Sequence, residues 1–276
     1  MGGVDGGLEN NYRALNASDM ACVQFLTRQG LPPLAYFRSC GQNPGVVFLT
    51  GFRSNMNGMK ALALEEYCRS EGRSFVRFDY TGCGSSKGDA DSCFLGNWKN
   101  DVLSVLDNLT TGPQVLVGSS MGGWLMLLAG LARPEKIVGL VGIATATDHF
   151  VNAYKQLPLE SRQEAERTGQ WTVASKYADS GFYTIKMDFV KEAEDHCLLQ
   201  GTVPISCPVR LIHGMEDELV PWQNSVHLAE RLASRDVDLL VRRSGDHRMT
   251  RDEDIQLLVA VVRDLVGKIE RNGLKS

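Results

Sequence analysis

The sequence predicts an α/β fold in which a mostly parallel central sheet carries helices on both faces. Apolar runs of strand length alternate with helix-like segments, and several runs are apolar at consecutive positions, as in strands buried on both faces. The alternation stops once, between about residues 148 and 203, where polar and aromatic residues become more frequent. We therefore expect one sheet domain, residues 20–147 and 204–276, with a helical lid inserted at residues 148–203.

The N-terminal part of the sheet domain contains two predicted strands and two predicted helices. Residues 1–19 are polar and rich in Gly and Asn, so we expect a frayed tail there. Residues 46–50 form an apolar run that stops at a glycine and predict a buried strand, and residues 75–80 predict the next one. Helices are expected at residues 59–68 and at residues 98–109, where apolar side chains recur at helical spacing.

The remaining elements repeat this alternation. Residues 114–118 and 137–145 are apolar runs that predict strands, and the almost wholly apolar segment 124–132 between them predicts a buried helix. The elements expected after the insertion are a strand at 209–213, a helix at 222–233, a strand at 237–242 and a long helix at 252–269.

Composition excludes several classes of protein. A chain of 276 residues can bury a core without a metal or disulfide staple, and its net charge of −4 is unlike that of a nucleic-acid binder. The longest apolar stretches fall short of the ~20 residues that a membrane span requires, so we expect no transmembrane segment. Seven cysteines without a C-x-x-C pair favour a reducing compartment. We expect a monomer.

A candidate nucleophile lies between a predicted strand and a predicted helix. Residues 118–122 read Gly-Ser-Ser-Met-Gly and match G-x-S-x-G. This string is common, but a strand before it and a helix after it are the context that a nucleophile elbow requires. The pattern makes Ser120 the nucleophile and puts Ser119 at the variable position. The alternative is a strand–helix turn without chemistry.

A serine nucleophile needs a base, and His247 has the position expected of it. It lies in a loop directly after the last predicted strand, where it can reach the sheet edge near the elbow. His149 and His196 lie in or beside the insertion, and His227 lies inside a predicted helix. We interpret His213, which closes a strand before a glycine, as a turn histidine.

The acid is expected in the loop after the strand at 209–213. Three adjacent carboxylates compete there, Glu216, Asp217 and Glu218, and we favour Asp217 from the pattern H-G-x-x-D-x-x-V-P. Asp148 is the second candidate, because it follows an earlier strand. The alternative is an acidic turn that only stabilises the start of the next helix.

With these residues placed, the chain resembles the α/β-hydrolase family over residues ~45–270. The motifs that carry the resemblance are the elbow at Ser120, the acid segment that runs into Val220-Pro221, and Asp79-Tyr80-Thr81-Gly82-Cys83-Gly84-Ser85-Ser86, which is similar to the family's D-x-x-G-x-G-x-S loop. Thr50-Gly51 stands where the family usually has His-Gly. The family's oxyanion hole uses backbone N–H groups, so this departure leaves it intact.

Longer strings resemble one group within that family, the vertebrate mitochondrial palmitoyl-protein thioesterases that are also acyl-glucuronide esterases. The matching strings lie at residues 54–58, 118–124 and 207–215. The resemblance implies a triad of Ser120, Asp217 and His247, an S-acyl or acyl-glucuronide substrate and a mitochondrial location. It also implies that this chain is the mature form, without a presequence.

The expected mechanism proceeds through an acyl-enzyme. Ser120 attacks the carbonyl carbon, His247 takes its proton, and Asp217 fixes the imidazole tautomer. The backbone N–H groups of Met121 and Phe52 would bind the oxyanion, and neither a metal nor an organic cofactor is required. Acyl esters or acylated protein cysteines are the expected substrates.

The inserted segment is rich in aromatic residues. An aromatic lid suits an apolar acyl chain, but a small helical lid also needs aromatic residues for its own packing. Residues 149–189 hold seven of the chain's 21 aromatics: Phe150, Tyr154, Trp171, Tyr177, Phe182, Tyr183 and Phe189. We predict that Phe150, Phe182 and Trp124 bind substrate, and that Arg53, beside the oxyanion loop, contacts a substrate carboxylate. A serine peptidase and a non-catalytic ligand-binding scaffold are the competing hypotheses on the same fold.

Overall fold

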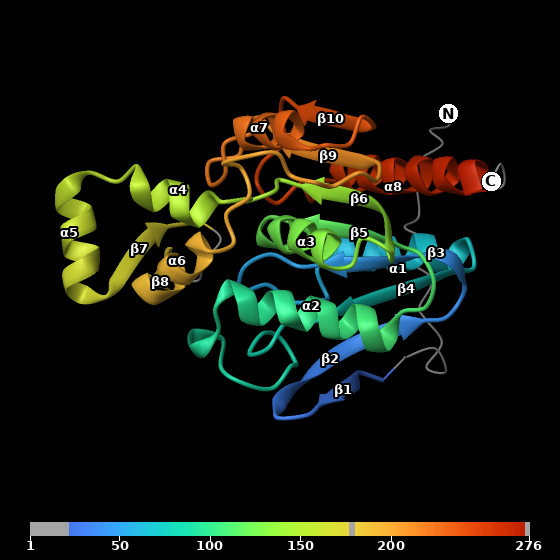
Figure 1. The fold of residues 1–276 in the computed structure, drawn as a ribbon, viewed down its shortest axis with the longest axis horizontal. Helices are drawn as coiled ribbons and strands as arrows, with labels where there is room; N and C mark the ends of the chain where they lie inside the picture. Colours follow the sequence, from blue (N-terminus) through green and yellow to red (C-terminus); the bar gives the residue numbers. More distant parts are fainter. Residues whose placement is uncertain (1–21, 177–179, 274–276) are drawn as a thin grey trace, which may run out of the picture.

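An eight-stranded sheet forms the centre of the protein (Figure 1), whose computed structural model describes residues 22–176 and 180–273. The strand order is β1-β2-β4-β3-β5-β6-β9-β10. From β4 to β10 all neighbours are parallel, whereas β2 is antiparallel to both β1 and β4. The strands are β1 (Gln24–Arg28), β2 (Leu31–Ser39), β3 (Gln42–Leu49), β4 (Arg73–Phe78), β5 (Gln114–Ser119), β6 (Ile137–Ile143), β9 (Val209–Gly214) and β10 (Val237–Arg242).

Helices cover both faces of the sheet, which confirms the predicted fold class. Buried residues of α1 and α8 pack in one cluster on one face, and those of α2, α3 and α7 pack in a second cluster on the other. These helices are α1 (Met59–Ser70), α2 (Leu95–Leu109), α3 (Met121–Ala132), α7 (Gln223–Arg231) and α8 (Asp252–Gly273). Among the helices of the described residues, none is long and apolar enough to cross a membrane.

The predicted strands and helices of the sheet domain are all present, with ends that differ by a few residues. The sequence analysis missed β1 and β2. Both lie at the antiparallel edge of the sheet and are only partly buried, and β2 contains Pro32 and Pro33, so they lack the continuous apolar run of a central strand. The predicted tail, residues 1–19, lies outside the described residues.

The segment between β6 and β9 lies beyond one end of the sheet (Figure 1). It contains α4 (His149–Lys155), α5 (Leu159–Thr168), β7 (Gln170–Ala174), β8 (Phe182–Lys186) and α6 (Met187–Glu194). Besides the helices expected of the insertion, it contains two strands that were not predicted, β7 and β8, which pair as an antiparallel hairpin. Exposed and half-buried residues alternate in β7, so this strand lacks the continuous apolar run that predicts the core strands.

Two carboxylates, Asp148 and Glu192, hold this segment in place. Asp148 lies just before α4 and accepts hydrogen bonds from the N–H groups of Leu198 and Leu199, which follow α6. Glu192 on α6 accepts from the N–H groups of Leu95 and Gly96 at the start of α2. The first contact joins the two ends of the insertion, and the second fixes α6 to the sheet domain.

Candidate active site

Ser120 lies at a strained turn between β5 and α3. Its φ of 56° and ψ of −121° are unfavourable for a residue with a side chain, and such strain is found at nucleophile elbows. Close packing enforces the turn: a Cβ on Gly118 would lie 2.4 Å from the Gly122 oxygen, and one on Gly122 would lie 2.3 Å from the Leu49 oxygen. The two glycines of the motif are therefore required by space, and they hold Ser120 at the end of the sheet.

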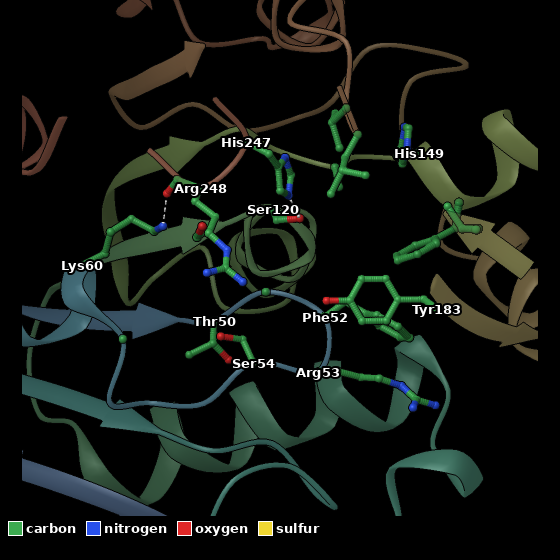
Figure 2. A pocket seen from close by; sticks show the side chains of 18 of the residues that line it. Thr50, Phe52, Arg53, Ser54, Lys60, Ser120, His149, Tyr183, His247 and Arg248 are labelled. Carbon is green, nitrogen blue, oxygen red and sulfur yellow. Dashed lines mark hydrogen bonds between the residues drawn. The ribbon is translucent and has the colours of Figure 1, made fainter. Parts of the chain in front are cut away.

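The three residues predicted as nucleophile, base and acid meet at the carboxyl ends of the parallel strands. His247 Nε2 lies 3.1 Å from Ser120 Oγ, and His247 Nδ1 lies 2.7 Å from Asp217 Oδ2. Ser120 follows β5, Asp217 follows β9 and His247 follows β10, so segments far apart in the sequence converge. Figure 2 shows the His247 ring above Ser120 at the wall of a cavity.

The carboxyl group of Asp217 is ionised and accepts hydrogen bonds. Burial by itself would raise the pKa of this carboxyl, but hydrogen bonds from His213, His247 and the Val220 N–H outweigh it and hold the pKa well below its usual range. An ionised carboxylate only accepts, so Nδ1 of His247 carries the proton and Nε2 presents a lone pair to Ser120. This is the tautomer that a general base needs.

The structure places the other candidate acids elsewhere. Glu216 and Glu218 are exposed and approach Arg251 and Lys176, respectively. Asp148 is buried at the base of the insertion with its oxygens bound to backbone N–H groups. The choice of Asp217 from the sequence pattern therefore agrees with its position.

His213 is a part of the site that sequence analysis missed. It is fully buried, and its Nε2 lies 3.0 Å from both Asp217 Oδ2 and the Val220 oxygen, while its Nδ1 lies 2.7 Å from Ser225 Oγ. Two acceptors at Nε2 require a proton there, so His213 donates to Asp217 Oδ2, the same oxygen that His247 Nδ1 contacts. A histidine directly after the apolar pair Leu211-Ile212 of a buried strand is the sequence signal that could have identified it.

Two backbone N–H groups next to Ser120 are available to a ligand. Met121 directly follows Ser120, and Phe52 lies in the turn after β3, which packs on Ser120 so closely that a Cβ on Gly51 would be 3.4 Å from the Ser120 Cβ. Neither N–H has a hydrogen-bond partner among the residues that the structure describes. This arrangement fits the predicted oxyanion hole.

The cavity beside Ser120 has a volume of about 770 Å³, within the ~300–1,000 Å³ range of small-molecule sites. Its wall on the side of the insertion is aromatic and includes Phe150, Trp171 and Tyr183. The Phe52 ring joins this wall, with centroids 5.3 Å from Phe150 and 5.9 Å from Tyr183. The turn after β3, which carries Phe52, is thus in direct contact with the insertion.

Three of the residues predicted to bind substrate do not present their side chains freely to the cavity. Trp124 is fully buried under the site and donates its Nε1–H to the His196 oxygen. Phe182 is 46% exposed, because it faces away from the cavity along the alternating hairpin. Arg53 borders the cavity, but its guanidinium pairs with Asp91 at the rim. Of the predicted aromatic contacts, Phe150 lines the cavity.

His149 also lines the cavity, and it is neutral at physiological pH. Burial lowers its pKa to about 4, and the neighbouring imidazoles of His247 and His213 act in the same direction, whereas Asp217 opposes them. Among the described residues, no cluster of three or more His, Cys, Asp or Glu side chains could hold a metal ion.

Comparison with known proteins agrees with this geometry. The model of the α/β-hydrolase family matches residues 46–261. The chain belongs to the α/β-hydrolase family. It is 53% identical over 249 residues to the mouse mitochondrial palmitoyl-protein thioesterase ABHD10, a match that covers 90% of this chain and 84% of the mouse protein.

Two solved structures are similar to most of this chain. The structure of mouse α/β-hydrolase domain-containing protein 10 covers 90% of this chain and 100% of its own, with a TM-score of 0.88 and 53% identity. A putative hydrolase from Agrobacterium vitis has a TM-score of 0.83 at 28% identity and covers 89% of this chain and 100% of its own.

Proposed function

We propose that this protein is a serine hydrolase that cleaves acyl thioesters, including S-palmitoyl proteins, and acyl-glucuronide esters. The observation that carries the proposal is the hydrogen-bonded series from Ser120 through His247 to Asp217 at the wall of an aromatic cavity. The relatives named as palmitoyl-protein thioesterases support the thioester substrate. They also support a mitochondrial location for this chain, as their names include it.

The catalytic cycle follows from the hydrogen-bond directions. Ser120 Oγ attacks the acyl carbonyl carbon as His247 Nε2 accepts the hydroxyl proton, and Asp217 stabilises the resulting imidazolium through Nδ1. The N–H groups of Met121 and Phe52 receive the oxyanion, and one such donor is typically worth ~10²–10³ in rate. His247 then protonates the thiolate or alkoxide leaving group, and a water molecule hydrolyses the acyl-enzyme by the same route.

The cavity favours an apolar acyl group. Its aromatic wall, formed by Phe52 and by the insertion, offers a surface for an alkyl or aryl acyl moiety. We propose that residues 148–203 act as a lid, because their side chains close the cavity on that side.

The test is labelling and turnover of Ser120→Ala. Wild-type protein is expected to react with a fluorophosphonate probe and to hydrolyse acyl thioesters and an acyl glucuronide, whereas Ser120→Ala does neither while its circular dichroism is unchanged. Ser119→Ala, at the neighbouring position of the motif, is the matched control and should retain labelling. Wild-type protein that is not labelled would favour the scaffold hypothesis, and faster turnover of aminoacyl amides than thioesters would favour the peptidase.

A further inference from the structure

The cavity has a second end, and it is cationic. Lys60, in the first turn of α1, and Arg248, which directly follows His247, both line it. Figure 2 shows the Arg248 side chain reaching into the cavity on one side of Ser120, with Tyr183 and His149 on the other side. Ser120 therefore lies between an aromatic wall and a pair of basic side chains.

We propose that this end binds an anionic group, a carboxylate or a phosphate, carried by the leaving group of the substrate. The proposal rests on the proposed function, because it assigns the two ends of the same cavity. The apolar acyl group belongs at the aromatic wall, and the scissile carbonyl must lie at Ser120, so the leaving group extends toward Lys60 and Arg248. His247, the residue that would protonate the leaving group, precedes Arg248 in the same loop.

A hydrogen bond holds the Lys60 side chain next to the loop that carries Arg248. Lys60 Nζ donates a hydrogen bond to the backbone oxygen of Arg248, which links α1 to the loop that carries His247. Burial lowers the pKa of Lys60 to about 8, and Arg248 contributes in the same direction against the opposing charges of Asp246 and Asp254. Lys60 therefore remains predominantly charged at neutral pH.

Two other charged side chains of the cavity wall, Glu218 and Arg53, pair with residues outside the cavity. Glu218 lies 2.9 Å from Lys176, and Arg53 pairs with Asp91. A guanidinium is a planar group of N–H donors that suits two oxygens of one anion, and Arg248 presents it at the cavity wall. A lysine beside it adds a second positive charge, so a mono- or dianion on the leaving group gains charge-assisted hydrogen bonds close to the reacting ester.

A pair of esters with one acyl group tests this selectivity. The hexanoyl ester of the 4-hydroxybenzoate phenol, 4-(hexanoyloxy)benzoate, carries a carboxylate on its leaving group. 4-(Hexanoyloxy)benzamide is its neutral counterpart. Wild-type enzyme is expected to prefer the anionic ester in kcat/KM. Arg248→Gln should reduce the anionic-to-neutral ratio by about 10- to 100-fold, since hydrogen bonds to charged groups are worth ~1.5–3 kcal/mol. General damage to the neighbouring His247 cancels in this ratio.

Two further variants separate a specific contact from a change of net charge. Arg248→Lys keeps the charge and should restore part of the preference. Arg243→Gln makes the same charge change in an exposed residue of the β10–α8 loop that does not line the cavity, and the ratio should stay at the wild-type value. An unchanged ratio in Arg248→Gln, or an equal fall in Arg243→Gln, would overturn the proposal.

The source of the anion is distinguished with two natural types of substrate. If Arg248→Gln loses turnover of an acyl glucuronide but not of an S-acyl peptide with acidic neighbours, the anion is a sugar carboxylate. The opposite result assigns it to the acylated protein, and each result supports an anion subsite. Failure of the proposed function has a different signature, because wild-type protein would then hydrolyse neither ester of the synthetic pair.

Discussion

The sheet domain and the inserted segment are built by different means, and the difference separates chemistry from selectivity. All residues of β5 and β9 are buried, and the loops that follow them carry Ser120 and Asp217. By contrast, Ala165 is the one buried residue of α5, and exposure alternates along β7. Buried strands on both sides fix the reacting groups, whereas α5 and β7 of the inserted segment are largely exposed.

The two regions share one hydrophobic cluster, in which buried residues of the insertion such as Ile185 and Phe189 pack with α2 and α3. The carboxylate of Glu192, the Trp124 side chain under the His196 oxygen and the Phe52 ring add local contacts. Within the insertion, α5 and β7 have few buried residues, and segments with few buried contacts open and change more easily than packed cores. Substitutions in the sheet domain should therefore abolish turnover, and substitutions in the insertion should alter which substrates are used.

The largest expected effect is in the sheet domain. Asp217→Asn should lower kcat by ~10³–10⁴, because an amide in place of the carboxylate no longer enforces the His247 tautomer that accepts the Ser120 proton. Steady-state kinetics with a short acyl thioester measure it. Glu216→Gln changes the neighbouring charge and is expected to stay within a few-fold of wild type. A loss below tenfold in Asp217→Asn, or a large loss in Glu216→Gln, would show that the acid is misassigned.

The next effect is in the insertion. Phe150→Ala removes one aromatic ring from the cavity wall and should reduce the ratio of kcat/KM for long over short acyl thioesters by about 10- to 100-fold. That range corresponds to the ~1.5–3 kcal/mol gained by burying a large apolar side chain or its equivalent. Phe182→Ala, on the exposed side of the hairpin, is the matched control. Equal ratios in the two variants would break the assignment of selectivity to the cavity wall.

A smaller effect tests the tie between the ends of the insertion. Asp148→Ala leaves the buried N–H groups of Leu198 and Leu199 without their acceptor and should cost about 1–3 kcal/mol of the free energy of unfolding. Proteolysis should then cleave the insertion before the sheet domain. Asp148→Asn retains one acceptor oxygen and should lie between Asp148→Ala and wild type. Cleavage that begins in the sheet domain would contradict a locally held insertion.

The smallest effect concerns pH. The folded pKa of Asp217 lies below its unfolded value of ~3.9, so its ionised form stabilises the fold above that pH, and the contribution is lost as the pH falls further. The difference in free energy of unfolding between wild type and Asp217→Asn should therefore be largest at about pH 5–7 and shrink below about pH 4. Denaturant titrations at several pH values measure it, and a constant difference would refute the linkage.

The same contrast explains what the sequence could predict. Central strands and the helices between them are visible because buried strands need consecutive apolar residues and the elbow needs glycines at 118 and 122. Ser120, Asp217 and His247 follow from their order along the strand ends. The half-exposed hairpin lacks the continuous apolar run of a core strand, and the roles of His213 and Arg248 depend on their positions in the folded site.

Trapping of the acyl-enzyme tests the central proposal most directly. Wild-type protein mixed rapidly with a palmitoyl thioester and quenched in acid should gain the mass of one palmitoyl group, and peptide mapping should place it on Ser120. Ser120→Ala should gain no mass and release no thiol above the uncatalysed rate. An acyl adduct on another residue, or thiol release by Ser120→Ala at the wild-type rate, would contradict a serine mechanism at this site.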